Sequence, residues 1–370
     1  MKKNRIHILC DRYVNFDTGK LTIGGIQTYV TDLSKVASSM GFEVYIYDFD
    51  NQKRKIVLDF CTIIGLNYPD TKKGCDKMAQ YVFDNMPSKE DLVIYDSDDR
   101  ISLTPLFNNA ISLQHGITWD MPNNKRRSLI RTLMGCTLRD YRILRRVTKV
   151  GMLVCVDCNF VNWYRTFIRN NRVNMRFIPN YTRISSTITK PDDTINIIFA
   201  RRLFKYRGTS IFTNAIKRIL GEYTNVKIFI YGNGPEEAWM HSQLDLYSNV
   251  FFDNYATGES LLVHADKHIA IVPTVGSEGT SLSLLEAMSS QCAVVCSDVG
   301  GMTNIVLDGF NGKMVPASNV EALYKAVKYL IDNPEERERM ANNGYETVKQ
   351  AFSFERWKKE WETILMEYIK

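Results

Sequence analysis

The fold of this chain is decided by one stretch, Gly276-Ser-Glu-Gly-Thr-Ser-Leu-Ser-Leu-Leu-Glu-Ala-Met-Ser-Ser290. It follows an apolar run, His268-Ile-Ala-Ile-Val-Pro273, which predicts a buried strand. After a turn of small polar residues, a helical pattern starts near Leu282. Such a turn presents unpaired backbone N–H groups and the positive end of a helix dipole, so the sequence predicts a binding site for a phosphate or another anion.

Two carboxylates frame this turn, Glu278 before it and Glu286 inside the helix, with seven residues between them. Backbone amides suit phosphate oxygens and carboxylates suit sugar hydroxyls, which together is the chemistry that a nucleotide sugar requires. A structural interpretation stays open beside this one. Ser283-Leu-Leu-Glu286 fits the S-x-x-E capping box, and Glu278 would then be an exposed loop carboxylate.

The length of 370 residues favours two domains, each with its own core. The first residues lead directly into a short strand, so we expect no signal peptide, and no apolar run approaches the ~18 residues of a membrane span. Eight cysteines lie mostly inside apolar runs, which is typical of buried thiols in a reducing compartment. These features predict a cytoplasmic protein.

A strongly basic segment runs from Lys125 to Lys149, with nine cations and one acid. Apolar residues alternate with the cations at steps of three and four, which predicts an amphipathic basic helix or helix pair. Two interpretations stay open. The helix lies on an anionic membrane surface, where each cation contributes ~1 kcal/mol, or it packs its apolar face on the core.

The first half of the chain alternates strands with helices. Ile6–Cys10 predicts a strand, Ile26–Met40 a helix that Gly41 stops, and Glu43–Asp48 a second strand. This βαβ unit requires a parallel sheet with a right-handed crossover. Further apolar runs follow at 92–95, 110–113, 151–156 and 175–179.

Polar residues from Thr182 to Thr194 predict a linker, after which the alternation of strands and helices starts again at Ile195. The sequence therefore predicts an α/β protein with two doubly wound halves. Ligands of such sheets bind beyond the carboxyl ends of the strands, so we expect the site in a cleft between the halves.

Several motifs, in their order along the chain, resemble those of the retaining glycosyltransferases of the GT-B fold, family 4. The resemblance is specific over about 170 residues of the C-terminal half and thinner in the N-terminal half. The motifs are Glu278-Gly-Thr-Ser-Leu-Ser-Leu-Leu-Glu286 (E-x7-E), Arg202-Leu-Phe-Lys-Tyr-Arg207-Gly208 (R-L-x3-K-G), Gly232-Asn-Gly-Pro-Glu236, Asp298-Val-Gly-Gly301, Asp308-Gly-Phe-Asn-Gly312, Gly24-Gly25 and Gln114-His115-Gly116.

The resemblance implies two Rossmann-like domains that face each other across a cleft. Residues 1–182 would bind the acceptor and 183–353 the nucleotide-diphosphate sugar, and a C-terminal helix, about 354–370, would pack back on the first domain. It also implies a hexosyltransferase-type reaction (EC 2.4) that retains the anomeric configuration and needs neither a metal nor a cofactor.

The same resemblance assigns roles to residues. His115, Glu278, Arg202 and Arg207 would be catalytic, with the arginines on the diphosphate, Glu278 on sugar hydroxyls and His115 beside the donor sugar. The donor would be bound by Gly25, Arg202, Arg207, Gly232, Glu278, Gly279, Thr280, Ser281, Leu282 and Glu286, with Glu286 on the ribose diol.

Three departures from the family pattern stand out. Arg201 replaces the usual glycine of G-R-L, and Arg207 replaces a lysine, which keeps the charge but changes its geometry. Thr280 and Ser281 stand where many members carry Phe-Gly. The change at Thr280 and Ser281 predicts an altered pocket around the donor sugar, and Arg207 would still hold the diphosphate in a different orientation.

Other interpretations compete with a transferase. Asp96-Ser-Asp98 after an apolar run is a D-x-D of the kind that binds metals, and Gly232-x-Gly234 suggests an NAD-linked Rossmann oxidoreductase. A non-catalytic nucleotide-sugar-binding protein is a third possibility.

We predict a retaining glycosyltransferase of surface polysaccharide or glycolipid synthesis, acting on a glycan or lipid-linked acceptor. It would be cytoplasmic or peripheral on the inner face of the plasma membrane, with no nucleic-acid partner.

Overall fold

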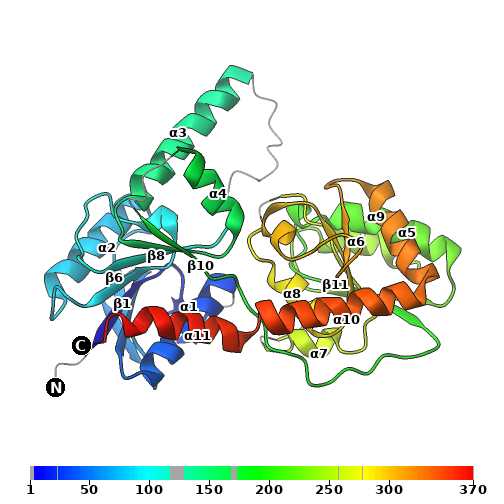
Figure 1. The fold of residues 1–370 in the computed structure, drawn as a ribbon, viewed down its shortest axis with the longest axis horizontal. Coiled ribbons are helices and arrows are strands. Elements are labelled where there is room, and N and C mark those ends of the chain that lie inside the picture. Colours follow the sequence, from blue (N-terminus) through cyan, green and yellow to red (C-terminus); the bar gives the residue numbers. More distant parts are fainter. Residues whose placement is uncertain are drawn as a thin grey trace. The chain divides into compact units, whose positions relative to one another are not determined.

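The structure, a computed structural model, describes residues 4–22, 24–116, 129–167, 173–256, 258–276 and 278–369. The chain folds into two compact units (Figure 1). The first unit takes its described residues from Met1–His115, Lys125–Pro179 and Trp357–Lys370, and Asn180–Arg356 belongs to the second. The chain therefore leaves the first unit after Pro179 and returns to it at Trp357.

The first unit is built on an eight-stranded sheet in the order β10-β9-β8-β7-β1-β4-β6-β5. All neighbours in this sheet are parallel except β5 and β6. The strands are β1 (Arg5–Leu9), β4 (Glu43–Asp50), β5 (Arg54–Val57), β6 (Thr62–Asn67), β7 (Leu92–Tyr95), β8 (Ala110–Gln114), β9 (Met152–Cys155) and β10 (Asn174–Phe177), and β2 (Val14–Asn15) pairs with β3 (Lys20–Leu21) in a separate hairpin.

The helices of the first unit follow from their apolar spacing. In α1 (Gly25–Ser39) the buried residues include Tyr29, Val30 and Leu33, which repeat at helical intervals and face the sheet. This helix ends before Gly41, whose φ of +88° no β-branched residue would adopt without strain, so the predicted stop is confirmed. The other helical elements are α2 (Lys72–Asn85), η1 (Asp98–Arg100), α3 (Leu129–Val147), α4 (Cys158–Phe167) and α11 (Phe354–Met366).

The second unit is a six-stranded, wholly parallel sheet in the order β13-β12-β11-β14-β15-β16. Its strands are β11 (Ile195–Ala200), β12 (Val226–Tyr231), β13 (Val250–Asp253), β14 (Ile269–Val272), β15 (Ala293–Ser297) and β16 (Lys313–Val315). The helical elements are η3 (Lys205–Arg207), α5 (Thr209–Glu222), α6 (Glu237–Leu244), α7 (Ser260–His264), α8 (Leu282–Ser289), η4 (Gly300–Asn304), α9 (Val320–Asp332) and α10 (Pro334–Ala351).

Helices cover both faces of this second sheet. Successive residues of β11 point to opposite faces, so Ile197 packs into one apolar cluster with α5 and α9, whereas Ile198 packs into another with α8 and α10. Since both faces are buried, the strands read as continuous apolar runs rather than alternating ones. The predicted doubly wound parallel sheet is therefore confirmed.

The strand order places a topological switch point in each unit. In the second unit the chain runs from β11 outward through β12 and β13, then returns to β14 on the other side of β11. In the first unit β1 has the same place between β4 and β7. Ligands of open α/β sheets bind at the carboxyl ends of the strands at such points, here after Ala200 and Val272, and after Leu9 and Tyr95.

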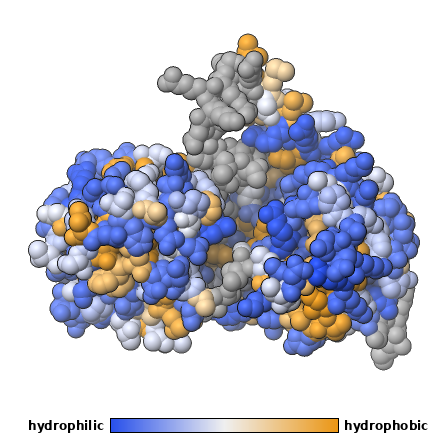
Figure 2. Space-filling view, turned by 180° about the vertical axis from the view of Figure 1, so that it is seen from behind, coloured by the Kyte–Doolittle hydropathy of each residue, from blue (hydrophilic) through white to orange (hydrophobic). Residues whose placement is uncertain are grey.

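Helix α3 projects from the rest of the first unit (Figure 1). Figure 2 shows apolar side chains exposed beside hydrophilic ones at its projecting end. The exposed apolar residues of α3 are Ile130, Leu133, Met134, Leu138 and Tyr141. The interpretation that this face packs on the core is therefore wrong for these residues. Residues 125–128 and the side chains of Leu129 and Arg131, which belong to the predicted basic segment, lie outside the described part.

Candidate active site

A carboxylate with two guanidinium groups lies at the switch point of the second unit. Arg201, directly after β11, donates from Nη2 to Glu278 Oε2 at 2.9 Å and from Nη1 to Thr274 Oγ1 at 2.7 Å. Thr274 Oγ1 in turn donates to Glu278 Oε2 at 3.0 Å, and Arg207 forms an ion pair with the same oxygen. Three donors thus use Oε2, whereas no described residue donates to Oε1.

The electrostatics of this cluster keep Glu278 ionised. Burial raises the pKa of the Glu278 carboxyl, but the charges of Arg201 and Arg207 and their hydrogen bonds outweigh burial, and the pKa lies below its usual value. The Arg201 side chain is only 5% exposed. Two cations and one anion leave a net charge of +1 at the strand ends. The cluster can therefore attract an anionic ligand while Glu278 accepts a hydrogen bond from it.

Two glycines allow the loops to approach closely enough to build the cluster. Gly208 has a φ of +82°, and a Cβ there would lie 1.8 Å from the carbonyl oxygen of Pro273. Gly300 has a φ of +51°, and a Cβ there would lie 2.0 Å from the carbonyl oxygen of Glu278. The neighbouring Gly301 N–H donates to that oxygen at 2.8 Å. These contacts fix the backbone on both sides of the ion pair.

Helix α8 begins at Leu282, as predicted, next to Glu278. Its N-cap residue is Ser281, whose side chain accepts no hydrogen bond from the first turn of the helix. The carbonyl oxygen of Thr280 accepts from Asn180 Nδ2 at 2.8 Å, which fixes the turn before the helix. The backbone N–H groups of the first turn are therefore not used by a side-chain cap.

The capping-box interpretation of Glu286 is wrong. Because α8 starts at Leu282, Ser283 lies inside the helix and cannot be its N-cap. The Glu286 carboxyl is hydrogen-bonded instead to the side chain of Ser260, the first residue of α7. Burial raises its pKa to about 7, and the bond to Ser260 opposes this shift only in part.

The two adjacent arginines after β11 have different surroundings. Arg201 continues the buried strand and reaches Glu278, although the sequence marked it only as a departure from the family pattern. Arg202 is exposed, lies over the ring of Phe204 at 5.7 Å, and forms no ion pair with a described carboxylate. Gly232 packs against the backbone of Arg201, where a Cβ would lie 2.4 Å from its carbonyl oxygen. The structure therefore brings Arg201, Arg207, Glu278 and Gly232 together and leaves Arg202 at the surface.

The other two predicted residues, Gly25 and His115, belong to the first unit. Gly25 opens α1 after the extended Gly24. His115 follows β8, and burial lowers the pKa of its ring to about 4, against a hydrogen bond to the Asp96 backbone. Its Nε2 is shielded from solvent and has no partner among the described residues. The ring is therefore neutral at physiological pH.

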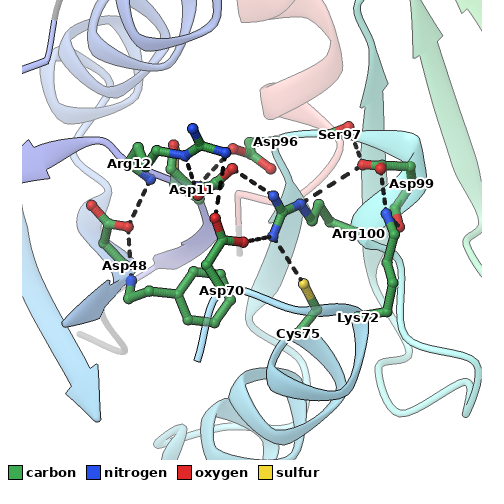
Figure 3. A network of polar contacts seen from close by, with 12 residues as sticks. Asp11, Arg12, Asp48, Asp70, Lys72, Cys75, Asp96, Ser97, Asp99 and Arg100 are labelled. Atoms are coloured by element: carbon green, nitrogen blue, oxygen red, sulfur yellow. Dashed lines mark hydrogen bonds and ion pairs between the residues drawn. The ribbon is translucent and has the colours of Figure 1, made fainter. Parts of the chain in front are cut away.

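A network of ion pairs occupies the switch point of the first unit (Figure 3). Asp96, after β7, accepts the backbone N–H of Asp11, after β1, at 3.0 Å. Arg100 forms ion pairs with Asp11 and with Asp70, each at 2.5 Å. Within the described ranges no group of three or more His, Cys, Asp or Glu is placed to hold a metal ion. Of the two D-x-D carboxylates, Asp96 thus takes part in the network through the backbone of Asp11.

Comparisons with known proteins identify relatives of this fold. Residues 180–347 match the family described as Glycosyl transferases group 1. An uncharacterized glycosyltransferase of Methanocaldococcus jannaschii is 23% identical over 355 residues, which cover 90% of this chain and 92% of that protein. Sucrose-phosphate synthase from Thermosynechococcus elongatus has a TM-score of 0.79 at 16% identity over 98% of both chains. HepE of Anabaena, in complex with UDP, has a TM-score of 0.71 at 14% identity, over 98% of this chain and 100% of that one.

These relatives confirm the predicted GT-B fold and the predicted family resemblance. They do not favour an oxidoreductase or a non-catalytic binding protein. Among the described helices, none combines the length and the apolar character that crossing a membrane would require.

Proposed function

Because residues 180–347 match the family described as Glycosyl transferases group 1, we propose that the second unit binds a nucleotide-diphosphate sugar. The sugar would pass to a glycan or a lipid-linked acceptor. The observation that carries this proposal is that the two oxygens of the Glu278 carboxylate have different surroundings. Its Oε2 is occupied by Arg201, Arg207 and Thr274, and its Oε1 is available to a ligand hydroxyl.

The surroundings of Glu278 fit the remaining parts of the donor. Arg207 and the unpaired Arg202 offer cations to the diphosphate, and the uncapped first turn of α8 offers N–H groups. In a site shielded from water, such cations stabilise the charge that develops on a leaving diphosphate. Glu286, at the other end of the E-x7-E motif, would accept hydrogen bonds from the ribose diol. We propose that Gly279, Thr280, Ser281 and Leu282 contact the phosphate and sugar oxygens through their backbone.

The reaction we propose retains the anomeric configuration. The acceptor hydroxyl would attack on the face from which the diphosphate leaves, and the arginines would supply the positive charge for departure. Gly25 and His115 of the first unit are proposed to take part, with the neutral His115 ring hydrogen-bonding the sugar. Support for these roles comes from the family motifs and from the unpartnered Nε2 of His115.

For the acceptor, we propose a substrate at an anionic lipid surface. The projecting end of α3 exposes apolar residues, and the same helix carries the exposed cations Arg142 and Arg145. Apolar residues that insert at the headgroup boundary, together with cations that attract anionic lipids, form the usual pattern of an interfacial helix. This arrangement favours a role in surface polysaccharide or glycolipid synthesis.

The test of the donor site is a titration with UDP-, GDP- and dTDP-sugars and with NAD by calorimetry. One class of nucleotide sugar should bind, and NAD should not. Release of a nucleoside diphosphate in the presence of a lipid-linked acceptor pool would then establish turnover. Binding of NAD alone, or no nucleoside diphosphate from any of these donors, would contradict the proposal.

A further inference from the structure

The end of the chain packs into the core of the first unit around one residue, Tyr29 of α1. Trp357 and Trp361 of α11 are 2% and 0% exposed, and Tyr29 is 2% exposed. The Tyr29 ring meets Trp357 edge to face at 5.0 Å and Trp361 at 6.2 Å between ring centroids. Such contacts between aromatic rings are directional, so they define the plane of the Tyr29 ring.

A hydrogen bond fixes the same side chain at its far end. The Trp361 Nε1–H donates to Tyr29 Oη at 2.8 Å. A phenol oxygen that accepts from a buried indole, on a ring that also packs on Trp357, has little freedom to move. Burial raises the pKa of Tyr29 well above its usual value, so the phenol is neutral.

On its other side Tyr29 contacts His115. The two rings meet edge to face at 5.2 Å, with an angle of 84° between their planes. The His115 ring is also hydrogen-bonded to the backbone of Asp96, which follows the neighbouring strand β7. One contact from α1 and one from the sheet therefore limit the rotation of the imidazole, and its Nε2 has no partner among the residues that the structure describes.

We propose that Tyr29, fixed by Trp357 and Trp361, is a positioning residue for His115. The last helix of the chain thereby sets the orientation of an imidazole that lies some 240 residues earlier in the sequence. This inference rests on the proposed function, because it concerns catalysis only if His115 takes part in sugar transfer. The geometric part, that Tyr29 fixes and shields the ring, can be tested without any activity.

The experiment compares the full chain with three variants, Tyr29→Leu, Tyr29→Phe and Trp361→Phe. Tyr29→Leu removes the ring that contacts His115. Tyr29→Phe keeps this ring but removes the oxygen that accepts from Trp361, and Trp361→Phe removes the donor. Trp163→Phe is the matched control, because Trp163 lies in the same unit and packs on Phe160 and Phe167 instead. Thermal unfolding and circular dichroism select the variants that fold.

The first measurement is the titration of the His115 ring by NMR with 13C-labelled histidine, assigned by His115→Gln among the five histidines. In the unsubstituted protein and in Trp163→Phe, the ring should stay neutral down to about pH 5. In Tyr29→Leu its pKa should rise by at least about one unit toward the ordinary value of ~6.5. Tyr29→Phe and Trp361→Phe should give smaller shifts in the same direction. An unchanged titration in folded Tyr29→Leu would overturn the proposal, and where that variant does not fold, an unchanged titration in Tyr29→Phe would do so.

The second measurement is turnover at saturating donor. We expect Tyr29→Leu to lower kcat about tenfold and Tyr29→Phe to lower it less. The KM of the donor should stay within about twofold of its value in the unsubstituted protein. A change in KM alone would contradict positioning of a reacting group. Full activity of His115→Gln would remove His115 from the reaction and overturn the catalytic part. If no donor turns over at all, the proposed function fails, while the NMR titration still decides whether Tyr29 holds His115.

Discussion

Arg201 and Glu278 form a buried ion pair, with Nη2 and Oε2 2.9 Å apart, at the switch point of the second sheet. Where the family usually has glycine, this chain has an arginine that binds one oxygen of the proposed sugar-binding carboxylate. The pair leaves only Oε1 of Glu278 for a ligand, so Arg201 restricts which hydroxyl geometry the carboxylate can accept. Several measurable properties of the protein depend on this cluster.

Replacement of Arg201 should destabilise the second unit. In Arg201→Met, Glu278 stays buried with Arg207 and Thr274 but loses its most buried counter-charge, and breaking a buried pair costs about 3 kcal/mol or more. Chemical denaturation measures the loss. Arg202→Met is the matched control, because this exposed neighbour forms no ion pair with a described carboxylate and its loss should change stability by about 0.5 kcal/mol or less. If the two substitutions lower the free energy of unfolding equally, the assignment of Arg201 as the buried partner of Glu278 is contradicted.

Glu278→Gln should impair the sugar contact and spare the nucleotide. Loss of a hydrogen bond to a charged group, worth about 1.5–3 kcal/mol, corresponds to a fall of roughly 10- to 100-fold in kcat/KM. The affinity for the nucleoside diphosphate alone, measured by calorimetry, should change less than about threefold. Glutamine retains the shape of the side chain but leaves Arg201 and Arg207 without a counter-charge, so thermal unfolding must first show that the variant is folded. A comparable loss of affinity for the bare nucleotide would place Glu278 on the diphosphate instead.

Arg202 should contribute to the diphosphate although it lies at the surface of the unliganded protein. Arg202→Met should weaken binding of the nucleoside diphosphate about tenfold or more, since a charge-assisted bond to phosphate is lost. Arg202→Lys should recover part of the affinity, because lysine keeps the charge without the planar fork. Calorimetric titrations of the three proteins decide the matter. Equal affinities would exclude Arg202 from the site.

Glu286 should make stability depend on pH. Its pKa rises to about 7 in the folded protein, so between about pH 4.5 and 7 the folded state binds a proton that the unfolded state has lost. Stability must therefore fall as pH rises through this window, by about 3 kcal/mol for this group. Glu286→Gln has no such charge to bury, so it should gain stability relative to the unsubstituted protein between pH 5 and pH 8. If the difference in unfolding free energy between Glu286→Gln and the unsubstituted protein does not change with pH, the Glu286 carboxyl has its ordinary pKa.

The exposed cations of α3 should govern partition to lipid. Charge reversal in Arg142→Glu combined with Arg145→Glu should lower binding to vesicles with phosphatidylserine by roughly 30-fold or more, at ~1 kcal/mol for each lost cation. Binding to neutral vesicles should be weak and unaffected. Lys325→Glu combined with Lys349→Glu, on α9 and α10 of the second unit, is the control for an equal change in net charge. If co-sedimentation with anionic vesicles is the same for all proteins, α3 does not bind membranes.

Most of the fold could be predicted from the sequence because the strands are continuous apolar runs bounded by turn residues. The strand before the Glu278 turn, the helix from Leu282 and the stop of α1 before Gly41 all lie where the pattern placed them. These signals are local. They depend on the conformational preference and the burial of residues that are neighbours in the sequence, and not on distant partners.

The site could be predicted only in part, because its geometry depends on neighbours that are distant in sequence. Ala200-Arg201-Arg202 gives two adjacent cations, and which of them turns inward depends on the position of β14 beside β11. The S-x-x-E pattern at Glu286 suggested a cap because the partner of this carboxyl, Ser260, lies on another helix. For α3 the amphipathic pattern was clear, but the same pattern fits a helix on a core and a helix on a membrane.

The return of the chain to the first unit has a consequence for its synthesis. Tyr29 is made long before its aromatic partners Trp357 and Trp361. Domains usually fold in the order in which they are made. Here the second unit can complete its sheet while the first still lacks α11. The nascent N-terminal half must therefore tolerate an open apolar pocket around Tyr29 until α11 has been made.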